Sequence, residues 1–306
     1  MLSRRNIRVK IMQTKYAAEQ MELEPGSGES NKILLHKVAQ SRKLFTYLIY
    51  FISETALYAE KDAAIKSSKH LPTKEDLSVN TRIAGNEVMW RWKNDPTFEA
   101  ALKEFKLKEL MDEELLKKTY QDLIASEDYQ DYIQLGERSK KSERHILSFI
   151  FNSLMLPNEN FIHHVEEHFA NWDDDAELMQ ALVTSYITKY QPQAFADILD
   201  AEKWDFAKRL LLTVEEKSEY LQELIAPKLK NWDADRIAAL DMIILKMGIA
   251  EFLYFETIPT RVTINEYIDL AKEYSTPQSG QFVNGLLDNI HKELLSENKI
   301  EKINYK

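Results

Sequence analysis

The chain has 306 residues, a net charge of −10 and no cysteine, which excludes disulfides, thiolate metal sites and a cysteine nucleophile. Only 7 glycines and 8 prolines interrupt long periodic segments, so we expect an all-α fold with little room for sheet. The longest apolar runs, 44–52 and 146–156, are too short to span a bilayer. No apolar signal-peptide segment follows the first arginines, and we therefore expect a cytoplasmic protein.

The first predicted element is a helix over residues 3–21, with Ser3 as its N-cap. Five cations in this helix precede the first acid, Glu19: Arg4, Arg5, Arg8, Lys10 and Lys15. A basic arm on an acidic body indicates a polarised molecule, although a solvated helix face is the simpler explanation of such a run. The sequence EPGSGESN, residues 24–31, is typical of a flexible linker.

The next segments are also predicted to be mainly helical. Periodicity favours a long amphipathic helix over 33–68, a loop over 71–80, and helices over 84–93 and 98–125 that the sequence NDP separates. Further on, a pattern of two helices, an Asn-Trp-Asp triplet and another helix occurs twice. The triplets are residues 171–173 and 231–233, and they indicate an internal repeat.

Signals for catalysis are weak. His164 and His168 have the i,i+4 spacing of two ligands on one helix, but a metal needs further ligands, so packing or surface histidines are the better interpretation. The chain lacks a phosphate-binding P-loop, a dinucleotide fingerprint and a nucleophile elbow. We expect no enzyme activity, no cofactor and no metal site.

Residues 237–255 are apolar nearly all round, which predicts a central, buried helix. Asp241, Lys246 and Glu251 interrupt it. Because a buried charge needs a partner, these side chains are expected either to form internal ion pairs or to contact another protein.

The segment 259–290 combines two short helical patterns with a polar break. Thr263 and Glu266 have the spacing of a capping box, which predicts a helix start. After the break, FVNGLLD places Phe282 at i,i+4 from Leu286, as in a core, and sets Gln281, Asn284 and Asp288 on another face. A glycine within a helix, Gly285, suggests a close approach of another element.

Three stretches resemble the NusB family of bacterial transcription antitermination factors. The first is SRRNIRVKIMQTKY, residues 3–16, which is similar to the family's arginine-rich opening. The second is 206–229, with LLLTV, Tyr-Leu and Pro-Lys-Leu in the family's order. The third and most specific is 236–288, which carries the apolar helix, INE, LAK and FVNGLLD.

This resemblance implies an all-helical bundle that binds boxA-type single-stranded RNA of ribosomal RNA leaders. The implied partners are the ribosomal protein NusE and the RNA polymerase antitermination complex. The implied RNA-binding residues are Arg4, Arg5, Arg8, Gln13, Tyr16, Gln281, Phe282 and Asn284, and the implied partner-binding residues are Asp241, Lys246 and Glu251. If all five early cations contacted phosphates, a plot of the logarithm of the RNA-binding constant against the logarithm of the salt concentration would have a slope of about −3.5.

The chain departs from the family pattern in length and in detail. We predict a basic RNA-binding helix at 1–22, an extra helical region at 23–200 and a NusB-like C-terminal bundle at 201–306. Lys15 replaces the usual Leu, Gln281 stands where many members have Lys, and Asn6 interrupts the basic run. A helical scaffold with reduced RNA binding is the alternative function. A ribosomal RNA cytosine methyltransferase, whose head can be NusB-like, is disfavoured because this chain lacks the cysteine nucleophile and the glycine-rich cofactor loop.

Overall fold

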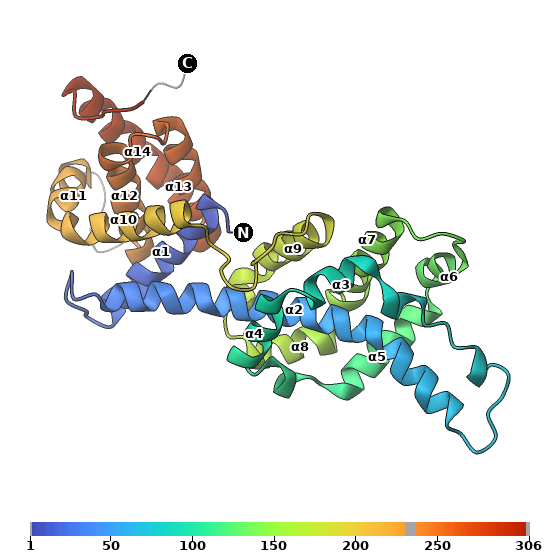
Figure 1. The fold of residues 1–306 in the computed structure, drawn as a ribbon. Coiled ribbons are helices and arrows are strands. Elements are labelled where there is room, and N and C mark those ends of the chain that lie inside the picture. The colour runs from blue at the N-terminus through green and yellow to red at the C-terminus, as the bar shows by residue number, and fades with distance from the viewer. Residues whose placement is uncertain (1, 230–236, 304–306) are drawn as a thin grey trace. The chain divides into compact units, whose positions relative to one another are not determined.

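The computed structural model describes residues 2–229 and 237–303, and every regular element in those ranges is helical (Figure 1). The predicted all-α fold is confirmed. The chain divides into two compact units, unit 1 with residues 39–198 and unit 2 with residues 2–38 and 199 onward. No helix in the described ranges is both long enough and apolar enough to cross a membrane.

Unit 1 is built on the long helix α2, whose first residues belong to unit 2. Figure 1 shows shorter helices arranged along it. The α-helices are α2 (Glu29–Ser67), α3 (Glu87–Lys93), α4 (Pro96–Glu104), α5 (Glu113–Ala125), α6 (Glu127–Gln134), α7 (Lys140–Phe149), α8 (Glu159–His168) and α9 (Trp172–Thr188). Short turns are η1 (Asp76–Ser78), η2 (Arg82–Gly85), η3 (Leu107–Leu110) and the π-helix η4 (Ile150–Met155).

Aromatic side chains of α2 form the centre of the unit 1 core. Phe51 packs edge-on against Phe161 of α8, with ring centroids 4.8 Å apart. The indole of Trp92 in α3 is buried and donates a hydrogen bond of 2.7 Å to the Ser53 hydroxyl. Such a bond lets an aromatic side chain lie inside the core without an unsatisfied N–H group.

The predicted long helix at 33–68 is confirmed as α2, but the single helix predicted at 98–125 is wrong. Lys106 adopts a left-handed conformation with φ of +51°, which ends the helical path after α4. Asp112 then accepts hydrogen bonds from the backbone N–H groups of Glu114 and Leu115 and starts α5 as an N-cap. The apolar periodicity continues across this break, so it does not show where one helix ends.

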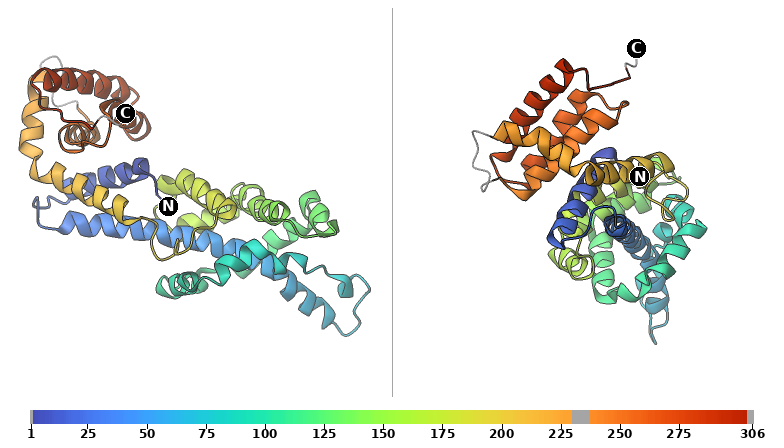
Figure 2. Two further views of the ribbon diagram at one scale, coloured as in Figure 1. Left: turned by 45° about the horizontal axis from the view of Figure 1, so that its top comes forward. Right: turned by 90° about the vertical axis from the view of Figure 1, so that its left-hand side faces the viewer.

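Unit 2 is a helical bundle around α12. Its helices are α1 (Arg4–Gln20), α10 (Ala201–Glu216), α11 (Ser218–Ile225), the short turn η5 (Ala226–Leu229), α12 (Ala239–Tyr254), α13 (Thr260–Tyr274) and α14 (Ser279–Ser296). Helix α12 contacts α1, α10, α11, α13 and α14. In both views of Figure 2 the orange and red helices α12 to α14 stay together. The predicted central, buried helix at 237–255 is therefore confirmed.

Of two helix starts predicted in unit 2, one is observed and the other is not. Ser3 caps α1 as predicted, because its hydroxyl accepts the Asn6 N–H while the Asn6 side chain accepts the Ser3 N–H. The capping box at Thr263 is wrong: α13 already begins at Thr260. Thr263 is fully buried and donates its hydroxyl proton to Glu251 instead.

The expected close approach occurs at Gly248 rather than at Gly285. A Cβ atom on Gly248 of α12 would lie 3.0 Å from a methyl carbon of Leu287 and 3.3 Å from the ring of Tyr267. A Cβ on Gly285 would meet no atom within 4 Å. Gly248 thus allows α13 and α14 to pack closely on α12, whereas Gly285 lies on the exposed side of α14.

Candidate nucleic-acid interface

The three arginines assigned to RNA each face carboxylates of unit 2. Arg4 lies 2.7 Å from Glu202 of α10, and its side chain is 40% exposed. Arg5 faces α13 and is 37% exposed. Arg8 faces α12 and is only 3% exposed. The basic arm is therefore neutralised locally, which a count of charges along the chain does not reveal.

Arg8 and Glu251 form a buried ion pair in the centre of unit 2. The Nε of Arg8 donates to Oε1 of Glu251 at 2.6 Å, and Nη2 donates to Oε2 at 3.0 Å. The carboxylate also accepts hydrogen bonds from the hydroxyls of Thr263 and Tyr267. Burial alone would lower the pKa of Arg8, but the hydrogen bonding to Glu251 and the charge interactions with Tyr267, Glu251 and Glu266 together outweigh it and raise that pKa. Burial raises the pKa of Tyr267, and the Glu251 charge adds to the effect.

This pair corrects two surface assignments. Arg8 was predicted to grip RNA phosphate, and Glu251 was predicted either to pair internally or to contact another protein. In the structure each satisfies the other inside the bundle, and Glu251 is fully buried. Removing either charge would leave the other uncompensated in the interior, so the pair holds α1 onto α12.

The other cations of α1 are buried, whereas a solvated basic face would leave them exposed. Lys10 and Lys15 are buried, and Lys15 lies 3.7 Å from Glu215 of α10. Tyr16 is 41% exposed, so its ring can meet a ligand. Gln13 is half-buried, and its Oε1 accepts no hydrogen bond from the described residues. This oxygen is itself buried, so a donor from outside the bundle would reach it only if neighbouring side chains moved.

Helix α14 presents two of its three assigned residues to solvent. Gln281 and Asn284 are exposed, while Phe282 is only 6% exposed. Burial of this ring favours the core interpretation that its spacing from Leu286 suggests. A base would reach Phe282 only if neighbouring side chains moved, whereas Asn284 can offer its amide donor and acceptor without rearrangement.

A chain of contacts connects Arg5 with the start of α14 through α13. Arg5 Nη1 lies 3.8 Å from Asp269, and the same carboxylate lies 3.7 Å from Nζ of Lys272. A Cβ on Gly280 would lie 2.7 Å from Cγ of Lys272, so the lysine stem crosses α14 at its first turn. The structure thus links the two predicted RNA stretches without a direct hydrogen bond or ion pair between their assigned residues in the described ranges.

Lys272 is the cation that the sequence prediction missed. Its side chain is 63% exposed, next to the residue that precedes Gln281. The charged positions Glu266, Asp269, Lys272 and Glu273 share the outer side of α13, and their helical spacing could have revealed a charged face. The sequence pattern of this helix instead suggested a capping box at Thr263 and Glu266.

The remaining residues assigned to a protein partner lie at the start and the middle of α12. Asp241 is 4% exposed and accepts a 2.7 Å hydrogen bond from the Ser279 hydroxyl. Lys246 is half-buried, and its Nζ lies 3.1 Å from the Ser218 hydroxyl. Burial lowers the pKa of Lys246, Lys15 lowers it further, and Glu19 opposes both. Of the three, Lys246 is the residue that a partner could reach most easily.

The two histidines and the first Asn-Trp-Asp triplet, all in unit 1, form hydrogen bonds within that unit. The Tyr47 hydroxyl lies 2.6 Å from Nε2 of His164, and Nδ1 of His168 lies 2.9 Å from the His164 carbonyl oxygen. Asn171, in the first Asn-Trp-Asp triplet, donates to the buried Asp175. The second triplet, 231–233, lies outside the described residues, so the repeat stays a prediction.

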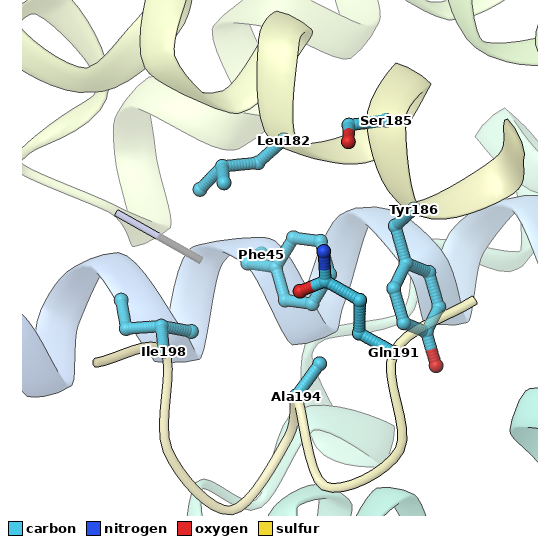
Figure 3. A pocket seen from close by; sticks show the side chains of 7 residues that line it. All are labelled: Phe45, Leu182, Ser185, Tyr186, Gln191, Ala194 and Ile198. Carbon is cyan, nitrogen blue, oxygen red and sulfur yellow. The ribbon is translucent and has the colours of Figure 1, made fainter. Parts of the chain in front are cut away.

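The cavity in Figure 3 has a volume of about 10 Å³. Its lining residues are Phe45, Leu182, Ser185, Tyr186, Gln191, Ala194 and Ile198. A volume of this size holds at most about one water molecule. This cavity is therefore too small for a substrate or a nucleotide.

The fold and this site define an all-helical bundle protein whose arginine-bearing first helix packs against its C-terminal helices. Residues 161–292 match the NusB family model. The transcription antitermination protein NusB of Clostridium botulinum (strain Kyoto / Type A2) is 34% identical over 149 residues, which cover 49% of this chain and 96% of that protein. The chain belongs to the NusB family, and the resemblance seen in the sequence is confirmed.

Other relatives match over shorter stretches. NusB of Methylacidiphilum infernorum (isolate V4) is 43% identical over 31% of this chain and 66% of its own length. NusB of Salinibacter ruber (strain DSM 13855 / M31) is 40% identical over 34% of this chain and 64% of its own length. The chain thus spans just under two thirds of each of these two proteins. A solved structure of T. maritima NusB is 31% identical, with a TM-score of 0.30, over 42% of this chain and 82% of that one.

Proposed function

We propose that this protein is an RNA-binding transcription antitermination factor that recognises boxA-type single-stranded RNA together with NusE. Its role is binding rather than catalysis, in the cytoplasm, as part of an RNA polymerase antitermination complex. The observation that carries the proposal is the placement of two partly exposed arginines at the start of α1. Arg4 lies beside Glu202 of α10, and Arg5 lies beside the outer face of α13. Membership of the NusB family supports the same role.

The proposed RNA site runs along α1 and across α13 to the start of α14. Arg4, Arg5 and Lys272 supply cations for phosphates, and Tyr16 supplies an exposed ring on which a base can stack. Gln13, Gln281 and Asn284 supply amide groups for base edges, which is how single-stranded RNA is usually read. Arg8 positions α1 through Glu251 and stays beneath this surface.

The test is a titration of boxA-type RNA and of a scrambled RNA at several salt concentrations, with and without NusE. Two phosphate contacts, from Arg4 and Arg5, give a log–log slope of about −1.4, and a third from Lys272 gives about −2.1. A slope near −3.5 would require about five phosphate contacts, two more than these three residues supply. Equal affinity for both RNAs, with and without NusE, would overturn the proposal.

The proposed NusE contact includes Lys246, the most accessible of the three residues assigned to a protein partner. Lys246→Glu should weaken NusE binding while affinity for RNA in the absence of NusE stays the same. Loss of RNA binding without loss of NusE binding would move Lys246 to the RNA site.

A further inference from the structure

We propose that three carboxylates of α13, Glu266, Asp269 and Glu273, compete with RNA phosphate for Arg5 and so limit the affinity for RNA. This inference rests on the proposed function, because it concerns the same site. It goes beyond that function by assigning an opposing role to acidic residues of the site.

The three carboxylates surround one guanidinium group. Glu273 Oε2 lies 2.9 Å from Nη2 of Arg5 and accepts a hydrogen bond from it. Glu266 and Asp269 each lie 3.8 Å from Nη1. Residues three and seven positions after Glu266 share its side of a helix, so the row is a property of α13 itself.

The nitrogens held by this row are the ones that phosphate needs. Arg grips phosphate through parallel N–H groups at the edge of its planar guanidinium. With Nη2 donating to Glu273, a phosphate must displace that carboxylate before it can bind in this way. The incoming phosphate would also lie close to Asp269 and Glu266, and like charges repel each other.

The exchange requires no opening of the core. The side chains of Arg5, Glu273 and Asp269 are 37%, 43% and 52% exposed. Exposed ion pairs of this kind contribute only about 0.2–1 kcal/mol each, so RNA can replace them at a modest cost. The Arg8–Glu251 pair is different, because both of its side chains are at most 3% exposed.

Glu273 is the member of the row best suited to a test. Glu266 also lies 3.4 Å from Arg8, and Asp269 also lies 3.7 Å from Lys272. In the described part of the chain, Arg5 is the one cation that pairs with Glu273. A matched control exists in Glu297, which is 44% exposed and pairs with Lys299 at 2.8 Å.

The experiment is a double-mutant cycle on the full chain with boxA-type RNA at fixed salt. Glu273→Gln should tighten RNA binding roughly two- to fivefold, the equivalent of one exposed ion pair. The same substitution in an Arg5→Ala background should change the affinity little, since there is no longer a guanidinium to compete for. Glu297→Gln removes the same charge elsewhere and should leave the affinity unchanged.

The outcomes separate this inference from the proposed function. If the wild type binds boxA-type RNA and Arg5→Ala weakens it, but Glu273→Gln has no effect, the competition is overturned and the RNA site stands. An equal gain from Glu273→Gln in both backgrounds, or from Glu297→Gln, would mean that only general repulsion is relieved, which also overturns it. If no variant binds RNA, both proposals fail.

Discussion

Arg8 in the first helix and Glu251 in the central helix form a two-point ion pair with side chains that are 3% and 0% exposed. We expect Arg8→Ala to lower the free energy of unfolding by about 3–5 kcal/mol, because it leaves a buried carboxylate without a counter-charge. Urea denaturation measures this loss.

Arg4→Ala is the matched control, since its ion pair is exposed and contributes at most about 1 kcal/mol. If Arg8→Ala reduced RNA affinity while leaving stability unchanged, Arg8 would belong to the RNA site and not to the core.

Two glycines in neighbouring helices should respond to alanine in opposite directions. Gly248→Ala places a methyl group against Leu287 and Tyr267, and overpacking of this kind costs about 1–3 kcal/mol. Gly285→Ala meets no atom and should stabilise α14 by about 0.5–1 kcal/mol, because alanine is the better helix former. The midpoints of urea unfolding of both variants provide the measurement. Destabilisation by both substitutions would contradict the packing described for α12.

Lys302 gives unit 2 a pH dependence above neutrality. Its Nζ donates to the carbonyl oxygens of Glu251 and Phe255 at the end of α12, and burial lowers its pKa to about 8. Between about pH 8 and its unfolded value of 10.5, the folded chain has lost a proton that the unfolded chain retains. Stability should therefore rise with pH across this window.

The contribution of Lys302 is the difference in the free energy of unfolding between the wild type and Lys302→Met, a variant that lacks the titrating group. Chemical denaturation of both proteins between pH 7 and about pH 10.5 measures it. A difference that stays constant across the range would show that Lys302 does not titrate there.

His164 gives unit 1 a pH dependence on the acid side. Burial lowers its pKa, and the neighbouring His168 lowers it further. Below an unfolded pKa of about 6.5 the unfolded chain gains a proton that the folded chain resists, so stability should fall as the pH drops below that value. His164→Gln should flatten this decline, whereas the substitution of exposed His70 by Gln should preserve it. Melting temperatures between about pH 5 and pH 7.5 test the pair of variants.

Helix α1 and the burial of α12 could be predicted because their signals are local. Ser3 followed by a periodic segment is sufficient to place the start of α1, and an apolar circumference is sufficient to bury α12. The burial of Arg8, Lys10 and Lys15 could not be predicted in this way. Arg8 pairs with a carboxylate of α12 and Lys15 with a carboxylate of α10. Both partners lie more than 190 residues further along the chain.

The errors in the site share one physical cause. Thr263 has the residue type and spacing of a cap, yet its hydroxyl donates a hydrogen bond to the buried Glu251. Phe282 follows a helical core pattern, and the structure buries it although the family resemblance suggested a stacking surface. In both cases tertiary contacts decide between two roles that the local sequence allows equally. The exposed positions, Arg5, Tyr16 and Asn284, remain predicted RNA contacts.

The pairing of Arg8 with Glu251 also affects the order in which the chain can fold during its synthesis. The two residues are 243 positions apart, so α1 leaves the ribosome roughly 12–50 s before its partner at 5–20 residues per second. Unit 1, a continuous stretch from 39 to 198, is synthesised in full within this interval, before α12 is made. The arginines of the nascent α1 therefore spend that interval without the carboxylates that later neutralise them.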